Sequence, residues 1–214
     1  MNREDWFLDG KKAKIEETED GIILSSGPTF EEDASHCVLW TKKRYHGNLK
    51  VSFDYTPLDT AGEESVSVCI LYLLAEGEGS AEYPRDITLW NDKRTVPAMS
   101  LYFEHMRFYH ISFAAYDRNH EPHSYVRARE YKAGGFQGTD LKPDYLPGTL
   151  FAPGSTTHIE AMKQGHFLSF TATDDRQTLH CQWELQDPIL QSGRVGIRQM
   201  GGRKGKFEHI TIEC

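Results

Sequence analysis

Apolar and polar residues alternate along most of the chain with a period of two, the period of a β-strand that buries one face. Leu49, Val51, Phe53 and Tyr55 share one parity of such a segment. The same alternation predicts strands over residues 99–103, 109–115, 123–130, 157–162, 167–173, 179–185, 194–200 and 207–213. Residues 65–75 are apolar at both parities, which is typical of a central strand covered on both faces.

Turn-forming residues separate these segments at hairpin spacing, for example Gln164 with Gly165 and Asp174 with Asp175. Residues 86–94 are a short helical candidate, and residues 134–153 have the composition of an ordered surface loop. Many short strands without a long helix favour two packed sheets. We therefore predict an all-β, two-sheet antiparallel jelly-roll sandwich, with residues 1–214 as a single domain.

Composition narrows the range of partners. The chain has 214 residues, of which 38% are hydrophobic and 12% aromatic, enough for a packed core. Its 24 Lys and Arg against 32 Asp and Glu give a net charge of −8, which disfavours nucleic acid as a partner. The N-terminal residues lack a leader-like apolar stretch, and no run reaches the roughly 18 apolar residues of a membrane span. The sequence thus predicts a cytoplasmic protein without a membrane partner.

Several familiar chemical motifs are missing. The four cysteines are far apart and lack metal-ligand spacing, so we expect reduced thiols rather than ligands at Cys37, Cys69, Cys181 and Cys214. We predict no metal and no cofactor, although a structural calcium ion remains open. The sequence has no phosphate-binding Gly-rich loop, no Gly-x-Ser-x-Gly motif and no run of paired carboxylates on one strand. The last absence weakens a hydrolase that works with two carboxylates.

If apolar parity marks the core, the polar positions of the same strands mark an outer face. These positions are Tyr102, Glu104, His110, Ser112, Tyr125, Arg127, Arg129 and Arg198. Aromatic rings stack on the apolar faces of sugars, and charged groups bind their hydroxyls and carboxylates, so this mixture suits a carbohydrate. The alternative is an ordinary solvated face, and the sequence favours neither interpretation.

Among these positions, Arg127 and Arg129 give the most specific indication of a ligand. Two guanidinium groups at i and i+2 project from the same face of a strand and repel each other unless an anion lies beside them. They could therefore hold a uronate carboxylate, or pair with Asp or Glu across the strand. His36 and Trp40 share a parity in an earlier segment. Trp40 could stack on a sugar ring, but a strand tryptophan is more often part of the core.

These residues resemble a known bacterial family. The resemblance covers nearly the whole chain and rests on residues 35–40 (Ser-His-Cys-Val-Leu-Trp), 99–106 (Met-Ser-Leu-Tyr-Phe-Glu-His-Met), 109–115 (Tyr-His-Ile-Ser-Phe-Ala-Ala), 125–129 (Tyr-Val-Arg-Ala-Arg) and 193–198 (Gly-Arg-Val-Gly-Ile-Arg). The chain is similar to the YesU family, whose members have a galectin-like, concanavalin A-like jelly roll and no defined function. The resemblance implies that fold and a genomic setting of pectin and rhamnogalacturonan degradation. It implies no catalytic residues.

Three functions follow from the sequence. The first is an enzyme acting on an acidic oligosaccharide, either a lyase or a hydrolase. In a lyase Tyr102 or His110 would supply base and acid while Arg127 and Arg129 neutralise the carboxylate; in a hydrolase Glu104 would donate the proton. The second is a lectin-like binder that uses the same surface without catalysis. The third is a structural dimer whose exposed sheet is the interface, with Tyr102, His110 and Trp40 buried between subunits.

Overall fold

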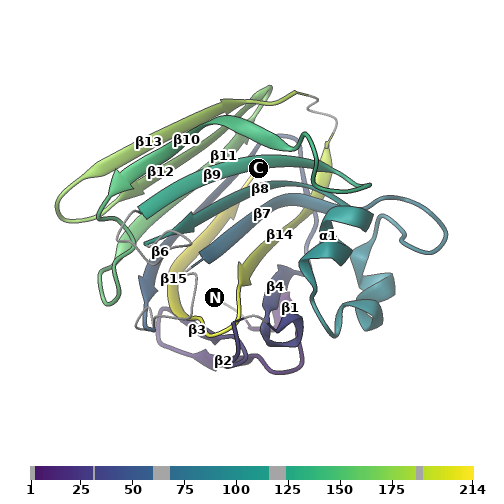
Figure 1. Cartoon of the computed structure of the whole chain (residues 1–214), viewed down its shortest axis with the longest axis horizontal. Coiled ribbons are helices and arrows are strands. Elements are labelled where there is room, and N and C mark those ends of the chain that lie inside the picture. The colour runs from purple at the N-terminus through teal and green to yellow at the C-terminus, as the bar shows by residue number, and fades with distance from the viewer. Residues whose placement is uncertain (1–2, 31, 60–67, 116–123, 187–189) are drawn as a thin grey trace.

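A computed structural model describes residues 3–30, 32–59, 68–115, 124–186 and 190–214. These residues form two antiparallel sheets packed face to face (Figure 1). The eight-stranded sheet, called sheet A, has the order β1 (Trp6–Asp9), β4 (Cys37–Thr41), β14 (Ser192–Gln199), β7 (Val68–Gly77), β8 (Met106–Ala114), β9 (Ser124–Lys132) and β10 (Asp140–Gly148), with β5 (Tyr45–His46) also paired to β14. The predicted two-sheet sandwich is confirmed.

Sheet B has seven strands. Their order is β13 (Thr178–Glu184), β12 (Phe167–Thr173), β11 (Thr157–Gln164), β6 (Leu49–Pro57), β15 (Lys204–Glu213), β3 (Gly21–Ser25) and β2 (Lys14–Glu17). Short 3-10 helices occur at η1 (Arg3–Asp5), η2 (Asp33–Ser35) and η3 (Ile87–Arg94), and one α-helix, α1 (Met99–His105), is present in the described part of the chain. None of the described helices is long and apolar enough to cross a membrane.

The core lies between the two sheets and confirms the parity of several predicted strands. Tyr109, Ile111 and Phe113 of β8 point into it, as predicted, and Phe53 of β6 meets them from sheet B. Cys37, Cys69 and Cys181 are free, buried thiols, and Cys214 is free and exposed. Burying these apolar side chains supplies the main driving force that holds the sheets together.

Sheet A is covered on its outer face as well, but only in part. Between β7 and β8 the chain leaves the sheet, forms η3 and α1, and returns across that face (Figure 1). A second apolar cluster lies beneath this segment and includes Trp40, Tyr72, Trp90, Tyr102 and Phe108. The central strand β7 is therefore buried on both faces, as its apolar pattern predicted.

Two segments have a secondary structure that differs from the sequence prediction. Residues 99–103 were expected to form a strand but belong to α1. Within α1, Tyr102 lies in the outer cluster and Met99, one helical turn earlier, packs against it; so short an alternation fits a strand or a helix. Residues 134–153 contain strand β10 rather than only a loop. The segment includes Pro143 and Pro147, and β10 is an edge strand, which tolerates prolines.

Buried polar contacts fix the η3–α1 segment to sheet A. One oxygen of Asp9 on β1, Oδ2, accepts hydrogen bonds from Arg94 Nε at 2.7 Å, Trp40 Nε1 at 2.7 Å and Tyr102 Oη at 2.8 Å. The fully buried side chains of Asp9 and Arg94 form an ion pair. Burial raises the pKa of Asp9, and the charge of Arg94 and the three hydrogen bonds act in the opposite direction. This cluster joins β1 and β4 to both helices.

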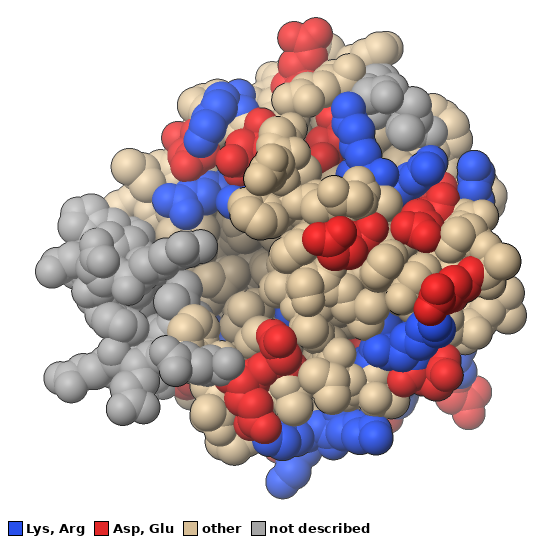
Figure 2. All heavy atoms as spheres, turned by 45° about the vertical axis from the view of Figure 1, so that its right-hand side comes forward, with Lys and Arg blue, Asp and Glu red and all other residues tan. Residues whose placement is uncertain are grey.

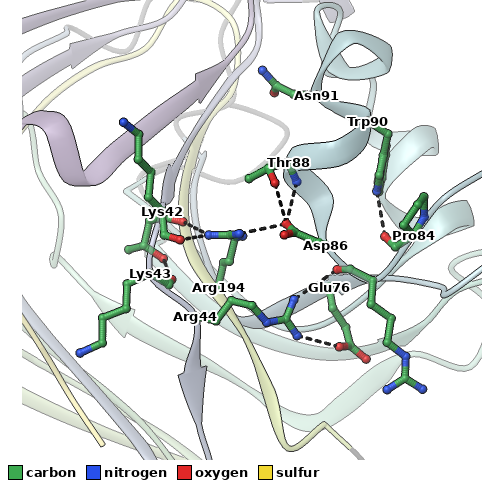
Figure 3. Close-up of polar contacts among 12 residues, drawn as sticks. Lys42, Lys43, Arg44, Glu76, Pro84, Asp86, Thr88, Trp90, Asn91 and Arg194 are labelled. Atoms are coloured by element: carbon green, nitrogen blue, oxygen red, sulfur yellow. Dashed lines mark hydrogen bonds and ion pairs between the residues drawn. The ribbon is translucent and has the colours of Figure 1, made fainter.

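A second polar cluster holds the beginning of η3 (Figure 3). The buried Arg194 of β14 donates from Nη2 to Asp86 Oδ1 at 2.9 Å, and its Nη1 donates to the backbone carbonyls of Thr41 and Lys42. Asp86 also caps η3 by accepting a hydrogen bond from Thr88 N. The helical candidate at residues 86–94 is thus confirmed as a capped 3-10 helix.

Candidate functional site

A pocket of about 450 Å³ opens on the part of the outer face of sheet A that α1 leaves uncovered. Its described lining consists of Phe30, Val68, Ile70, Met99, His110, Ser112, Tyr125, Arg127, Arg129 and Met200. Strand register explains why the polar members meet. Ile70, Ser112 and Arg127 are directly opposite one another on β7, β8 and β9, and His110 and Arg129 form the next row. The predicted neighbourhood of β8 and β9 is therefore real.

His110 forms part of the wall of this pocket. Its side chain is only 3% exposed, and its ring packs against Tyr72 and Tyr131, each with a centroid distance of 5.6 Å. Nδ1 has no hydrogen-bond partner among the described residues. Burial lowers the pKa of His110 well below its usual value, and the charges of Arg129 and Arg198 lower it further. A neutral imidazole therefore faces the pocket at neutral pH, with one nitrogen as donor and one as acceptor.

The two arginines of β9 line the pocket beside His110 and Ser112. Arg129 Nε donates to Asp140 Oδ1 at 2.8 Å, and Nη1 donates to Tyr131 Oη at 3.2 Å. Arg127 Nε is 3.0 Å from Asp144 Oδ2 without the alignment of a hydrogen bond, and its guanidinium lies 4.4 Å above the Tyr125 ring. Both arginines thus have the cross-strand partners that the sequence left as an alternative. Both guanidinium groups also line the pocket, where no described lining residue is a carboxylate.

Besides His110, three predicted site residues are buried in contacts within the chain, namely Tyr102, Arg198 and His36, and Trp40 is buried as a strand tryptophan more often is. Tyr102 and Trp40 bind Asp9 beneath α1. Arg198 Nη2 lies 2.9 Å from His36 Nδ1 and donates to Pro97 O at 2.6 Å. Burial and the charge of Arg198 lower the pKa of His36 to about 4. Parity assigned Arg198 to the correct outer face of sheet A, but it could not show that the η3–α1 segment covers that face.

Glu104 is exposed but belongs to α1 and does not line the pocket. The pocket also contains residues that the sequence did not single out. Its apolar part comes from Phe30, Val68, Ile70, Met99 and Met200. Apolar residues that line a pocket have the same sequence pattern as apolar residues of a core, so no signal distinguished them. The aspartates that pair with Arg127 and Arg129 lay in the segment interpreted as a loop.

Comparison with known proteins places this chain in a family. A family model described as a domain of unknown function, DUF1961, matches residues 1–212. The chain belongs to the DUF1961 family. No curated protein matches its sequence significantly. The family match and a galectin-like structural neighbour support the galectin-like character predicted from the sequence. The assignment to YesU itself stays a prediction.

Solved structures share the fold of this DUF1961 chain at low identity. A protein of unknown function with a galectin-like fold from Bacillus subtilis is 19% identical, with a TM-score of 0.70, and the match covers 98% of this chain and 89% of that one. A legume lectin-like domain from Entamoeba histolytica is 8% identical, with a TM-score of 0.65 and coverage of 98% and 90%. The exoplasmic/lumenal domain of VIP36, solved with Ca²⁺ and Man3GlcNAc, is 9% identical, with a TM-score of 0.58 and coverage of 98% and 83%.

The chemistry available in the pocket of this DUF1961 chain is recognition by hydrogen bonds and charge. His110, Ser112 and the two guanidinium groups can bind hydroxyls or a carboxylate, and Tyr125 and Ile70 offer apolar surface. Hydrolysis by two carboxylates has no support in the described lining. Among the described residues, no three His, Cys, Asp or Glu side chains are grouped as metal ligands. The structural calcium ion that the sequence left open stays an open expectation.

Proposed function

We propose that this protein binds an acidic oligosaccharide in the pocket on the outer face of sheet A. The observation that supports this most directly is the lining: Arg127 and Arg129 lie beside the neutral His110 in a pocket without a described carboxylate. A carboxylate on the ligand would form ion pairs with the arginines through directional hydrogen bonds. Ser112 and the imidazole would bind hydroxyl groups.

Because the whole molecule is acidic, an anionic ligand has to be attracted by positive charges in the pocket itself. At a net charge of −8 the long-range field repels anions. Acidic and basic side chains are also interspersed over the face drawn in Figure 2, so this face has no broad basic patch. Asp140 and Asp144 reduce the positive charge of the two arginines, but they belong to β10 and do not line the pocket. An anion inside the pocket therefore meets guanidinium groups first.

A sugar suits the pocket better than a small inorganic anion. About 450 Å³ is the size of a site for an organic ligand, and half of the described lining residues are apolar. The hydrophobic faces of pyranose rings need such surface. Carbohydrate recognition also occurs on this fold, since one structural neighbour is named a carbohydrate recognition domain and another was solved with Man3GlcNAc. These likenesses support the class of ligand, and the arginines support its acidity.

Calorimetric titration tests this proposal with a pair of matched ligands. Trigalacturonate carries carboxylates, and its methyl ester has the same sugar chain without charge. We expect wild-type protein to prefer the acid, and Arg129→Lys or Arg127→Lys to weaken its binding by about tenfold or more, because an ammonium lacks the planar fork. Arg176→Lys is the control, since Arg176 is exposed and lies outside the pocket. Equal affinity for the two ligands would contradict the acidic specificity.

A second candidate is β-elimination at the same site, favoured by the neutral imidazole of His110. Its unprotonated nitrogen would take the C5 proton of a uronate while the arginines stabilise the enolate charge; the C4–O bond then breaks and the leaving oxygen takes up a proton. Tyr102 is not part of this candidate, because its hydroxyl donates to Asp9. Incubation with trigalacturonate distinguishes the two: an unsaturated uronate absorbance establishes the lyase, and binding without it supports the lectin-like binder.

A further inference from the structure

The outer face of sheet A continues beyond the pocket as a chain of aromatic contacts. Arg129 binds the hydroxyl of Tyr131, the next outer residue of β9. The ring of Phe103 on α1 stacks over Tyr131 with a centroid distance of 6.3 Å and an interplanar angle of 14°. Phe136, in the turn between β9 and β10, meets Phe103 edge-on at 5.5 Å. These contacts connect the arginine side of the pocket to the end of α1.

Phe136 is exposed although the turn that carries it is firmly tied down. The residue is 56% exposed. The turn is bound to the end of α1 by hydrogen bonds from Gly134 N to Glu104 O at 2.8 Å and from Gly135 N to Phe103 O at 3.1 Å. Thr139 Oγ1 donates to Phe136 O at 2.7 Å within the turn.

The backbone of this turn depends on its glycines. Gly134 and Gly135 have φ angles of +80° and +116°, values that side chains with a Cβ rarely adopt. The sequence therefore builds a fixed frame that holds an aromatic ring toward solvent. A pre-organised exposed aromatic loses little conformational entropy when a ligand binds to it.

We propose that Phe136 and Phe103 form a second subsite, which stacks on the apolar face of the sugar that follows the uronate held by Arg127 and Arg129. This inference rests on the proposed function and makes the ligand an oligosaccharide rather than a single sugar. From Arg127 to Tyr131 the strand advances by roughly 13 Å at about 3.3 Å per residue, which is longer than one pyranose ring. The carboxylate subsite and the aromatic subsite therefore hold different rings of one chain.

The test compares galacturonic acid with trigalacturonate on wild type and Phe136→Ala by calorimetry and ligand-observed NMR. Wild type should bind the trisaccharide more tightly than the monosaccharide. Phe136→Ala should lower the affinity for the trisaccharide by roughly two- to tenfold, the usual contribution of an aromatic contact, and leave the monosaccharide unaffected. Phe136→Trp should retain the tighter binding because it keeps an aromatic face. Thermal unfolding of Phe136→Ala checks that the fold is intact.

Phe167 provides the matched control. It is a phenylalanine of sheet B that is 46% exposed, so Phe167→Ala removes the same ring from a surface without a proposed role. Unchanged trisaccharide affinity in Phe136→Ala, or an equal loss in Phe167→Ala, would overturn the second subsite while the acidic-sugar proposal stands. Failure of wild type to bind either ligand would remove both proposals. Those outcomes are distinct, so the two ideas are tested separately.

Discussion

The outer faces of the two sheets carry similar residue types in opposite environments. On sheet B, Ser52, Asp54 and His158 project from the neighbouring strands β6 and β11, and His209 joins them from β15. His158 Nδ1 lies 2.6 Å from Asp54 Oδ1, and His158 Nε2 lies 3.3 Å from Ser52 Oγ. On sheet A, His110 and Ser112 lie beside Arg127 and Arg129. Each face thus presents histidine, hydroxyl and charge.

Burial distinguishes the two faces. His158 and His209 have side chains that are 49% and 61% exposed, whereas His110 is almost completely buried. The pKa of His209 is raised by its hydrogen bond to Asp54, but the pKa of His110 is lowered by burial. The serine, histidine and aspartate on sheet B lie within bonding distance, but with His158 half exposed they do not exclude water from a reacting group. The presence of suitable residue types is therefore not enough to make a binding or catalytic site.

The largest difference between the faces should appear when one aspartate is removed from each. Asp9→Ala leaves Arg94 buried without its partner, so we expect unfolding to become easier by about 3–5 kcal/mol. Asp54→Ala removes contacts to two exposed histidines and should cost less than about 1 kcal/mol. Urea unfolding followed by circular dichroism measures both. Equal losses would mean that the covered face of sheet A is no more tightly held than the open face of sheet B.

A pH titration should separate the histidines of the two faces. The pKa of His36 is about 4 in the folded protein, against 6.5 for an unperturbed histidine. Below pH 6.5 the unfolded chain takes up a proton that the folded protein excludes, so stability falls as the pH decreases toward 4. For His36 this amounts to about 2 kcal/mol between pH 7 and pH 5. His209 has a raised pKa, so its contribution is complete at low pH and is lost as the pH rises through that pKa.

NMR signals of the histidine rings give the measurement. We expect His209 to become protonated at a higher pH than His36 on acidification. His36→Gln should reduce the loss of stability between pH 7 and pH 5, since the amide does not titrate. Titration of His36 near its ordinary pKa of about 6.5 would contradict the assigned environment.

The smallest effect is expected for His158→Ala. His158 is half exposed and makes only surface contacts to Asp54 and Ser52, so its removal should change stability by less than about 0.5 kcal/mol. Binding of trigalacturonate should be unchanged, because sheet B lies on the opposite side of the core. A clear loss of binding in this variant would indicate that the ligand binds on sheet B and would contradict the proposed site on sheet A.

The comparison also explains which parts of the site could be predicted. Alternation in β8 and β9 correctly separated Ile111 and Phe113 from His110, Ser112, Arg127 and Arg129, because strand side chains alternate strictly between faces. What covers a face is a tertiary property. Tyr102 was assigned to a strand because seven residues of alternating polarity do not distinguish a strand from a short helix. His110 was expected to be exposed, and only its packing against Tyr72 and Tyr131 reveals its burial.

The Gly-Arg-Val-Gly-Ile-Arg segment shows the same limit of sequence reasoning. Arg198 was assigned to the binding surface and instead supports the segment before α1 through Pro97. The packing explains why a glycine occupies position 196. A Cβ there would lie 2.3 Å from the ring of Trp40, too close for two carbon atoms. The motif therefore allows Trp40 to lie flat against β14, and it positions the covered half of the outer face rather than the ligand.

The most direct test of the central claim is to follow the histidine ring signals of isotope-labelled protein during a titration with trigalacturonate. We predict that the signals of His110 shift in proportion to the bound fraction, because its ring lines the pocket. The signals of His158 and His209 should stay in place at constant pH, since both rings lie on sheet B. Shifts at His158 and His209 with His110 unchanged would contradict the claim that the outer face of sheet A is the binding site.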